Sequence, residues 1–177
     1  MRTGSSSESA LRVALRHVEA LGGEIKIISG DDLVMPMYEY GSSSGAQSKK
    51  MIDAVKWADS LILSTPGYHG GPSGLMKNAL DHLEELRAHE RPYLDGMAVG
   101  CIAVAEGWQA AVNAIQGLRT IVHALRGWPT PYGATINNSS KEGGVFDRSG
   151  DCRDETVRKQ LETVAEMVVS FGQSVRK

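Results

Sequence analysis

Residues 60–83 read SLILSTPGYHGGPSGLMKNALDHL. The stretch opens with the apolar run 61–63, which predicts a short strand, and it closes with apolar residues at helical spacing. Between the two lies a loop with four glycines, one tyrosine and one histidine. Open α/β sheets bind their ligands where the carboxyl end of a strand leads into such a loop. The stretch therefore predicts a fold of alternating strands and helices, and the place of its ligand.

The loop is suited to a flat ligand. Its glycines lack a Cβ, so the backbone can adopt positive φ and approach a planar group closely. Pro66 and Pro72 restrict the backbone at the two ends of the loop.

The rest of the chain repeats the same alternation. Apolar spacing and capping residues predict helices over about 5–21, 47–58, 74–86, 109–126 and 154–171, and strands over 24–28, 61–63, 97–105 and 132–136. The segment 97–105 is apolar throughout, as in a parallel strand covered on both faces. We therefore expect residues 1–177 to form a single α/β domain, a doubly wound parallel sheet in a three-layer α/β/α sandwich.

Composition excludes several classes of partner. The net charge is −2, which does not fit a nucleic-acid-binding surface. No apolar run approaches the ~18 residues of a membrane span, and no signal peptide follows Met1. The two cysteines have no metal-ligand spacing, so we expect a reduced, cytoplasmic protein that binds a small molecule. His82, Glu85 and His89 share a helix face, which we interpret as a solvated charged face rather than a metal site.

Two further loops contain candidate binding residues. Arg2 with Ser5, Ser6 and Ser7 joins a cation, hydroxyl groups and free N–H groups at a helix N-terminus, which suits a phosphate. The alternative is an ordinary serine-rich N-cap, since Ser5 and a glutamate three residues later form a capping-box pattern.

A second strand-end loop follows the segment 97–105. It reads Glu106-Gly107-Trp108-Gln109 and precedes a long helix. Trp108 could form a wall of the ligand site or contact another subunit, and the sequence does not separate these alternatives.

Together, RTGSSS, TPGYHGGPSGLMKNALDHL and AEGW resemble the NADPH-dependent FMN reductase family, which has the flavodoxin-like fold. The resemblance covers nearly the whole chain. The family's central motif is matched at Thr65, Pro66, Tyr68, Gly74, Lys77 and Asn78. Gly67 replaces the usual Glu and His69 the usual Asn, which leaves the choice of substrate open.

The resemblance implies an FMN-dependent oxidoreductase that passes electrons from NADPH or NADH to a small acceptor: a quinone, an azo compound, a metal oxyanion or free flavin. It implies that FMN is bound by Arg2, Ser5, Ser6, Ser7, Pro66, Gly67, Tyr68, His69, Gly70, Gly71, Glu106, Gly107 and Trp108. We expect no catalytic side chain, because positioning supplies most of the rate of hydride transfer. Glu106 is expected to point away from the ring or toward a neighbour. The resemblance further implies a homodimer or homotetramer.

Three alternatives stay open. The chain could be an FMN-dependent dehydrogenase of one biosynthetic intermediate, a flavodoxin-type electron carrier, or a phosphate-binding domain without flavin. The near-neutral charge disfavours the electron carrier, since such carriers tend to be strongly acidic.

The sequence departs from the family at its start. The usual first strand, which is central in the flavodoxin order, has no counterpart. Its removal would leave the neighbouring strands about 9–10 Å apart with unpaired backbone groups. We therefore expect either that the native start lies upstream of Met1 or that the remaining strands pair differently.

Overall fold

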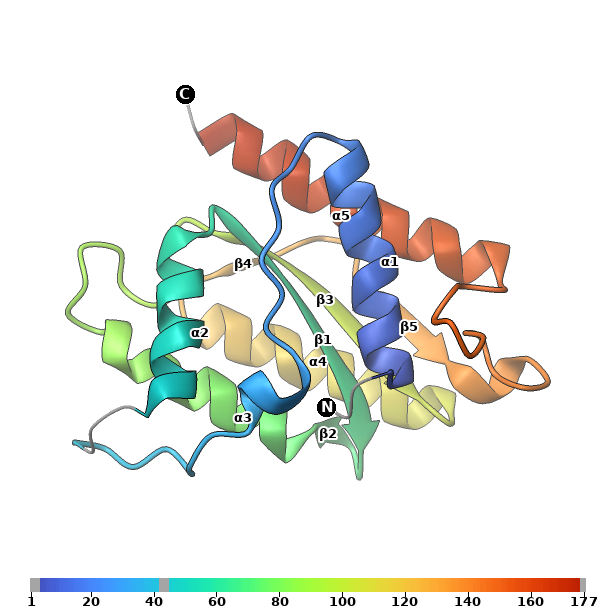
Figure 1. Cartoon of the computed structure of the whole chain (residues 1–177), viewed down its shortest axis with the longest axis horizontal. Helices are drawn as coiled ribbons and strands as arrows, with labels where there is room; N and C mark the ends of the chain where they lie inside the picture. The colour runs from blue at the N-terminus through green and yellow to red at the C-terminus, as the bar shows by residue number, and fades with distance from the viewer. Residues whose placement is uncertain (1–3, 42–44, 176–177) are drawn as a thin grey trace.

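A computed structural model describes residues 4–41 and 45–175 and shows a five-stranded mixed sheet with helices on both faces (Figure 1). β1 (Ser60–Tyr68) and β3 (Ala98–Ala105) pair in parallel, from Ser60 opposite Ala98 to Pro66 opposite Val104. β5 (Ala134–Asn137) and the short β4 (Trp128–Pro129) pair in parallel with different stretches of β3. β2 (Gly71–Pro72) turns back antiparallel to β1.

The helices form the two outer layers. The α-helices are α1 (Ser6–Ala20), α2 (Ala46–Trp57), α3 (Gly74–Asp81), α4 (Trp108–Ala124) and α5 (Glu155–Val175), and the 3₁₀ helices are η1 (Gly30–Leu33), η2 (His82–Leu86) and η3 (Asn138–Ser140). One apolar cluster joins α1 and α5 to β3 and β5, and a second joins α2, α3 and α4 to the other face of the sheet. The predicted flavodoxin-like three-layer fold is confirmed.

β3 forms the centre of this core. All of its residues are buried, as the apolar run predicted. Packing above it is tight: a Cβ on Gly100 would lie 2.6 Å from Val164 Cγ1 and 3.0 Å from Val168 Cγ2. Only glycine fits at this point of contact between β3 and α5.

Hydrogen-bonding residues start the helices where the sequence predicts. Ser5 caps α1 by accepting from Glu8 N at 3.3 Å, and Ser73 caps α3 by accepting from Met76 N at 3.2 Å. Asp154 accepts from Val157 N at 3.1 Å at the start of α5. These side chains satisfy N–H groups that have no partner inside the helix.

One strand prediction is wrong, and a second is wrong in part. Residues 24–28 form no strand, because the segment pairs with no ladder partner in the described chain. A cavity of about 180 Å³ lies instead between this segment and β1. The expected strand 132–136 begins only at Ala134, and the two-residue β4 precedes it.

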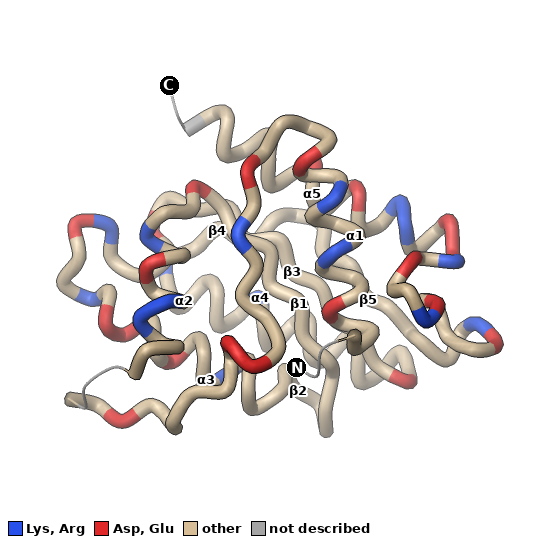
Figure 2. Tube along the Cα trace, in the orientation of Figure 1, with Lys and Arg blue, Asp and Glu red and all other residues tan. Residues whose placement is uncertain are grey.

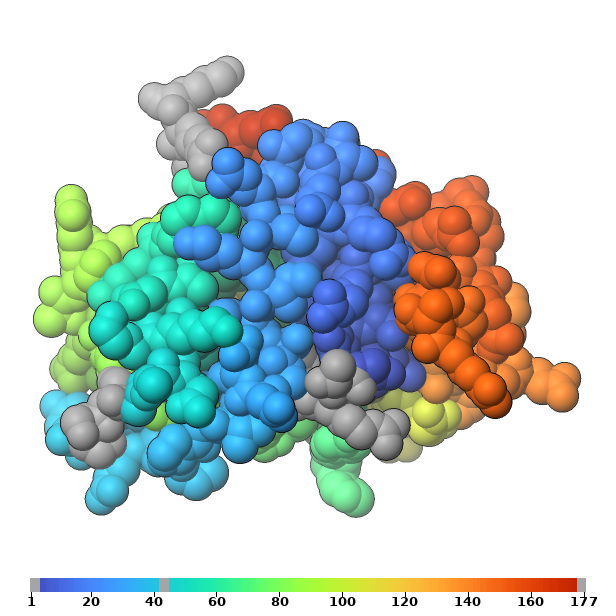
Figure 3. Space-filling view, in the orientation of Figure 1, coloured from blue at the N-terminus to red at the C-terminus, as the bar shows by residue number. Residues whose placement is uncertain are grey.

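The expected re-pairing of strands is not observed in the described residues. β1 pairs with β2 and β3 alone, so the edge of residues 60–66 opposite β3 has no ladder partner there. The segment 24–33 lies between α1 and α2 and covers this side of the sheet (Figure 3).

The connection from η1 toward α2 is fastened to α3 by polar side chains. Asn78 Oδ1 accepts from Tyr38 N at 2.8 Å, and its Nδ2 donates to Pro36 O at 3.0 Å. His82 Nε2 lies 3.1 Å from the same carbonyl, and the ring of His82 meets Tyr38 edge-on. The interpretation of His82 as part of a solvated charged face is therefore wrong, because the imidazole is buried against this connection.

Candidate functional site

Three segments predicted to bind the ligand meet at one edge of the sheet. Because Pro66 lies opposite Val104 in the parallel ladder, the loops 66–71 and 106–108 leave neighbouring strand ends on the same side. The first turn of α1 joins them, since the Ser64 hydroxyl donates to Ser7 O at 2.7 Å. The structure thus brings Ser5, Ser6 and Ser7 to the strand ends. Arg2 lies outside the described residues.

The glycine-rich loop is a tight hairpin. Tyr68 pairs with Gly71, and the turn between them consists of His69 at φ 48° and Gly70 at φ 86°. Two consecutive positive φ values match the type of turn that fits the twist of a two-residue hairpin. The Ser73 N–H donates to Thr65 Oγ1 at 3.0 Å and closes the base of the hairpin. The tip is exposed, so its backbone is accessible to a ligand.

The glycines of the hairpin have different roles. A Cβ on Gly67 would lie 2.8 Å from Ala110 O and 3.2 Å from Ala105 Cβ, so Gly67 allows β1 to pass close to α4. Space around Gly70 and Gly71 is open, with no atom within 4 Å of a Cβ placed there. Close approach of a flat group is therefore possible at Gly70 and Gly71, whereas Gly67 is fixed by packing.

Large aromatic side chains flank this edge. Tyr68, the last residue of β1, is 60% exposed, and Trp108, the first residue of α4 after the loop that follows β3, is 56% exposed. Such exposure of large apolar side chains marks surfaces that bind ligands or other proteins. Figure 2 shows that the neighbouring strands and the hairpin bear no charged residue. This part of the edge suits an uncharged planar group.

Glu106 points away from the hairpin. Its carboxylate accepts from Ser139 Oγ at 2.6 Å and from Asn138 Nδ2 at 3.0 Å, both in η3. These hydrogen bonds, with that of Ser139 the larger effect, lower the pKa of the carboxyl below its ordinary value. The Glu106 carboxylate is therefore directed at η3.

The first turn of α1 has features of a phosphate cradle. Gly4 has φ 75°, and the helix begins at Ser6 with its N-terminal N–H groups at the strand ends. Such N–H groups and hydroxyls bind phosphate oxygens, and the helix dipole favours the negative charge. The turn also contains the buried carboxylate of Glu8, which accepts from Gly4 N at 2.9 Å. The capping-box pattern indicated Glu8, although its bond goes to Gly4 rather than to Ser5.

The two cysteine thiols are buried and not exposed at this edge. Cys101 and Cys152 are buried and unpaired, and burial raises the pKa of the Cys101 thiol to about 12. Among residues 4–41 and 45–175 no group of three or more His, Cys, Asp or Glu side chains could hold a metal ion. Within the same ranges no helix is long and apolar enough to span a bilayer. The hairpin and the α1 turn therefore offer mainly backbone groups, hydroxyls and aromatic rings, with the imidazole of His69 at the tip and the carboxylate of Glu8 in the turn.

Comparison with known proteins identifies relatives of the chain. The family model described as NADPH-dependent FMN reductase matches residues 1–141. The NADPH-dependent FMN reductase ArsH of Shigella flexneri is 27% identical over 176 residues, which cover 99% of this chain and 67% of that protein. The FMN-dependent NADPH-azoreductase of Staphylococcus haemolyticus is 37% identical over 123 residues, which cover 70% of this chain and 61% of that protein.

A solved structure shares the fold. The flavoenzyme FerB, an NAD(P)H:(acceptor) oxidoreductase from Paracoccus denitrificans, superposes with a TM-score of 0.78 at 19% identity, and the match covers 98% of this chain and 93% of that one. At this identity the likeness shows the fold alone. The chain itself spans about three fifths to two thirds of the length of the two sequence relatives.

Proposed function

Because this chain belongs to the NADPH-dependent FMN reductase family, we propose that it is an FMN-dependent oxidoreductase. In this proposal NADPH or NADH supplies the electrons, and a small molecule such as a quinone, an azo compound, a metal oxyanion or free flavin receives them. The observation that supports it most directly is the convergence of the α1 turn, the 66–71 hairpin and the 106–108 loop at one edge of the sheet. This is the edge where ligands bind in doubly wound sheets.

The residues present fit FMN. Ser5, Ser6 and Ser7 would hold the phosphate through hydroxyl and N–H groups, with Arg2 as an added cation. The isoalloxazine ring would lie against the open backbone of the hairpin at Gly70 and Gly71, between exposed aromatic side chains. Pro66, Gly67, His69 and Gly107 complete the proposed set as backbone of the two loops. When bound, FMN supplies the capacity to accept hydride from a nicotinamide and to pass electrons on.

The chain contributes positioning and charge placement. The Ser73–Thr65 hydrogen bond and the Gly67 contact with α4 fix the hairpin, so its N–H groups point in set directions. Preorganised N–H groups stabilise negative charge that develops nearby. The bonds from Ser139 and Asn138 hold the Glu106 carboxylate away, which avoids a like charge beside the ring. No side-chain acid or base is needed in this proposal.

A second copy of the chain would cover the exposed side of α4. Trp108 and Val112 lie one turn apart on α4, and both are exposed. Arg119 is the only Lys, Arg, Asp or Glu of this helix. Interface cores are depleted in charge and enriched in aromatic residues. A homodimer through this face is our proposal, with a homotetramer as the larger assembly. The substitution Val112→Glu should then shift the sedimentation mass toward the monomer, and an unchanged mass would contradict this interface.

A visible spectrum of the purified protein tests the cofactor. FMN addition should raise the melting temperature, and anaerobic NADPH or NADH should bleach the flavin absorbance. Trp108→Ala should weaken FMN binding. The matched variant Trp128→Ala should not, because Trp128 is 62% exposed but pairs with Ala98, at the opposite end of β3. Unchanged stability at saturating FMN would exclude the flavin proposal.

The same titration separates the alternatives. A dehydrogenase of one biosynthetic intermediate would bleach only with its own substrate, and an electron carrier would need a protein reductase. A cytoplasmic location stays a prediction from cysteine usage and is tested by fractionation of cells that produce the protein.

A further inference from the structure

An ion pair between the buried carboxylate of Glu8 and the half-exposed guanidinium of Arg12 lies at the turn proposed to bind phosphate. Glu8 is 2% exposed. Its Oε2 accepts from Gly4 N at 2.9 Å, and its Oε1 accepts from Arg12 Nη2 at 2.6 Å and Nε at 2.9 Å. The Ser29 hydroxyl adds a bond to the same oxygen at 3.3 Å. The Glu8 carboxylate therefore joins three parts of the chain by hydrogen bonds. Its partners are Gly4 before α1, Arg12 one turn further along α1, and Ser29.

The pair places two opposite charges beside the helix N-terminus. Glu8 is the third residue of α1 and Arg12 follows four residues later on the same face. Together they are close to neutral. Either charge alone would act strongly on an anion held by the N–H groups of this turn, since Coulomb interactions are large near partly buried sites.

A flavin phosphate introduces such an anion. A phosphate monoester bears about 1.5 to 2 negative charges near neutral pH. The Glu8 carboxylate opposes it, whereas the Arg12 guanidinium favours it and is held by Glu8. We propose that the Glu8–Arg12 pair determines how strongly this turn prefers a phosphorylated ligand over its dephosphorylated form. The proposal rests on the proposed function, which supplies FMN as the phosphorylated ligand.

Two flavins that differ only in the phosphate test this. Binding of FMN and of riboflavin is measured by fluorescence titration at low salt and mildly alkaline pH for the wild type, Glu8→Gln, Arg12→Gln and the double variant. The readout is the ratio of the riboflavin Kd to the FMN Kd. This ratio should rise about tenfold in Glu8→Gln and fall about tenfold in Arg12→Gln. In the double variant it should return close to the wild-type value.

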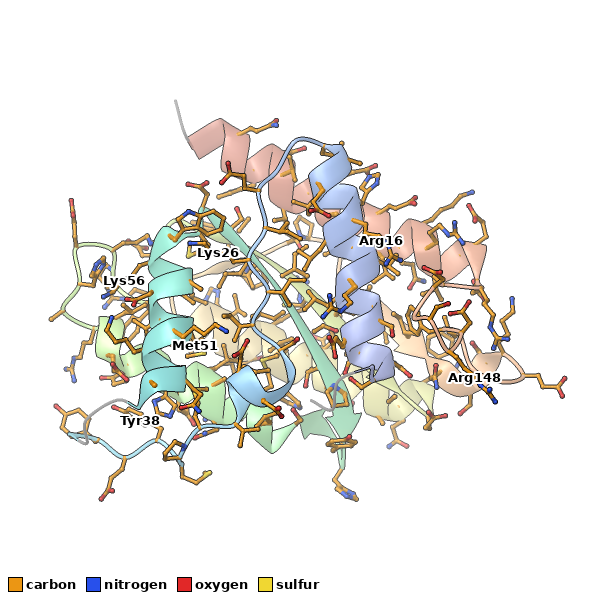
Figure 4. All side chains as sticks on the ribbon, viewed as in Figure 1. Arg16, Lys26, Tyr38, Met51, Lys56 and Arg148 are labelled. Carbon is orange, nitrogen blue, oxygen red and sulfur yellow. The ribbon has the colours of Figure 1, made fainter. Side chains whose placement is uncertain are left out.

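Arg16→Gln is the matched control. Arg16 lies one turn further along α1 and pairs with Asp151 at 3.2 Å, and Figure 4 labels it on the side of α1 near the 147–151 loop. In Arg16→Gln the ratio of the riboflavin Kd to the FMN Kd should not change. The opposite shifts of the two single variants are the signature of charge at the phosphate position.

Equal weakening of both flavins, with the ratio constant, would overturn the proposal and leave Glu8 a purely structural residue. A ratio that moves in the same direction in both single variants would overturn it as well. Failure of the wild type to bind either flavin would instead contradict the proposed function, so the two failures are distinguishable.

Discussion

The two edges of β1 are stabilised by different interactions. On one edge β1 joins β3, every residue of β3 is buried, and Gly100 leaves no room for a Cβ beneath α5. On the other edge a cavity of about 180 Å³ separates β1 from residues 24–28, and no ladder crosses it in the described residues. We call these the closed side and the open side of the sheet.

Side-chain contacts attach the segments around the open side to one another. The Arg91 guanidinium donates to Ala58 O at 2.8 Å and Val55 O at 2.6 Å, at the end of α2. Asn78 fastens the connection near Tyr38, and Glu8 bonds Ser29. Lys26 Nζ lies 4.0 Å from the ring centroid of Trp57, which ties the 24–28 segment to α2. The closed side is thus held by strand pairing and close packing, whereas the open side is held by individual side-chain contacts.

The largest expected effect is on the closed side. Gly100→Val places methyl groups where Val164 and Val168 already lie, so we expect a loss of about 3 kcal/mol in unfolding free energy. Urea denaturation measures it. The control Gly74→Ala, with open space around the residue and a helical position, should be neutral or slightly stabilising. A tolerated valine would show that the closed side is not tightly packed.

Breaking a polar attachment on the open side should cost less. Asn78→Ala leaves Tyr38 N without its partner and Pro36 O with His82 Nε2 alone, at an expected cost of about 2 kcal/mol. Hydrogen exchange should rise in residues 33–41 and stay unchanged in β3. The neighbouring control Lys77→Ala removes only an exposed pair with Asp81, so its effect should be under about 0.5 kcal/mol. Uniform loosening of both sides would contradict the distinction between them.

Arg91 offers a graded version of the same test. Arg91→Ala frees the last carbonyls of α2, and we expect a loss of about 1.5 kcal/mol. Arg91→Lys keeps the charge at the helix end but loses the two-pronged geometry, so an intermediate value is expected. Thermal unfolding monitored by circular dichroism measures the stability of both variants. Wild-type stability in both variants would mean that α2 does not depend on this bond.

Acid should loosen the open side before the closed side. Burial raises the pKa of Glu8, but the hydrogen bonds from Arg12, Gly4 and Ser29 and the Arg12 charge outweigh it, so the pKa is lowered overall. The stabilisation by Glu8 is thus complete above the ordinary value of 4.5 and is lost as the pH falls through the lower folded value. Exchange of residues 24–30 should rise over that range, and Glu8→Gln should abolish this pH dependence. If, as the pH falls, hydrogen exchange rose in β3 before it rose in residues 24–30, the expectation would be contradicted.

The smallest effect should come from filling the cavity. Ala54 on α2 lines it, as does Met51, which Figure 4 labels on the same helix. Ala54→Leu adds apolar volume to open space, so we expect a change within about 1 kcal/mol of either sign. The same substitution at the fully buried Ala103 of β3 should destabilise by about 3 kcal/mol. Equal costs at the two alanines would remove the difference between the sides.

Local signals predicted much of the fold and part of the candidate site. The apolar run 97–105 predicted a buried central strand, and Ser5 with Glu8 predicted the start of α1, because burial and capping depend on neighbours in sequence. The TPGYHGG loop and the serines were placed at one edge by the alternation of strands and helices. Which of these residues contact FMN stays a prediction.

The sequence alone thus determined the helices, the strands after residue 59 and the family, since these depend on residue patterns within single segments. Only the tertiary structure decided that 24–28 is not a strand, because a strand requires a neighbour at ladder distance. It also decided that Gly67 serves packing on α4, that His82 is buried against Pro36, and that Glu106 is held by η3. Each of these depends on groups distant in sequence, whose approach no local pattern specifies.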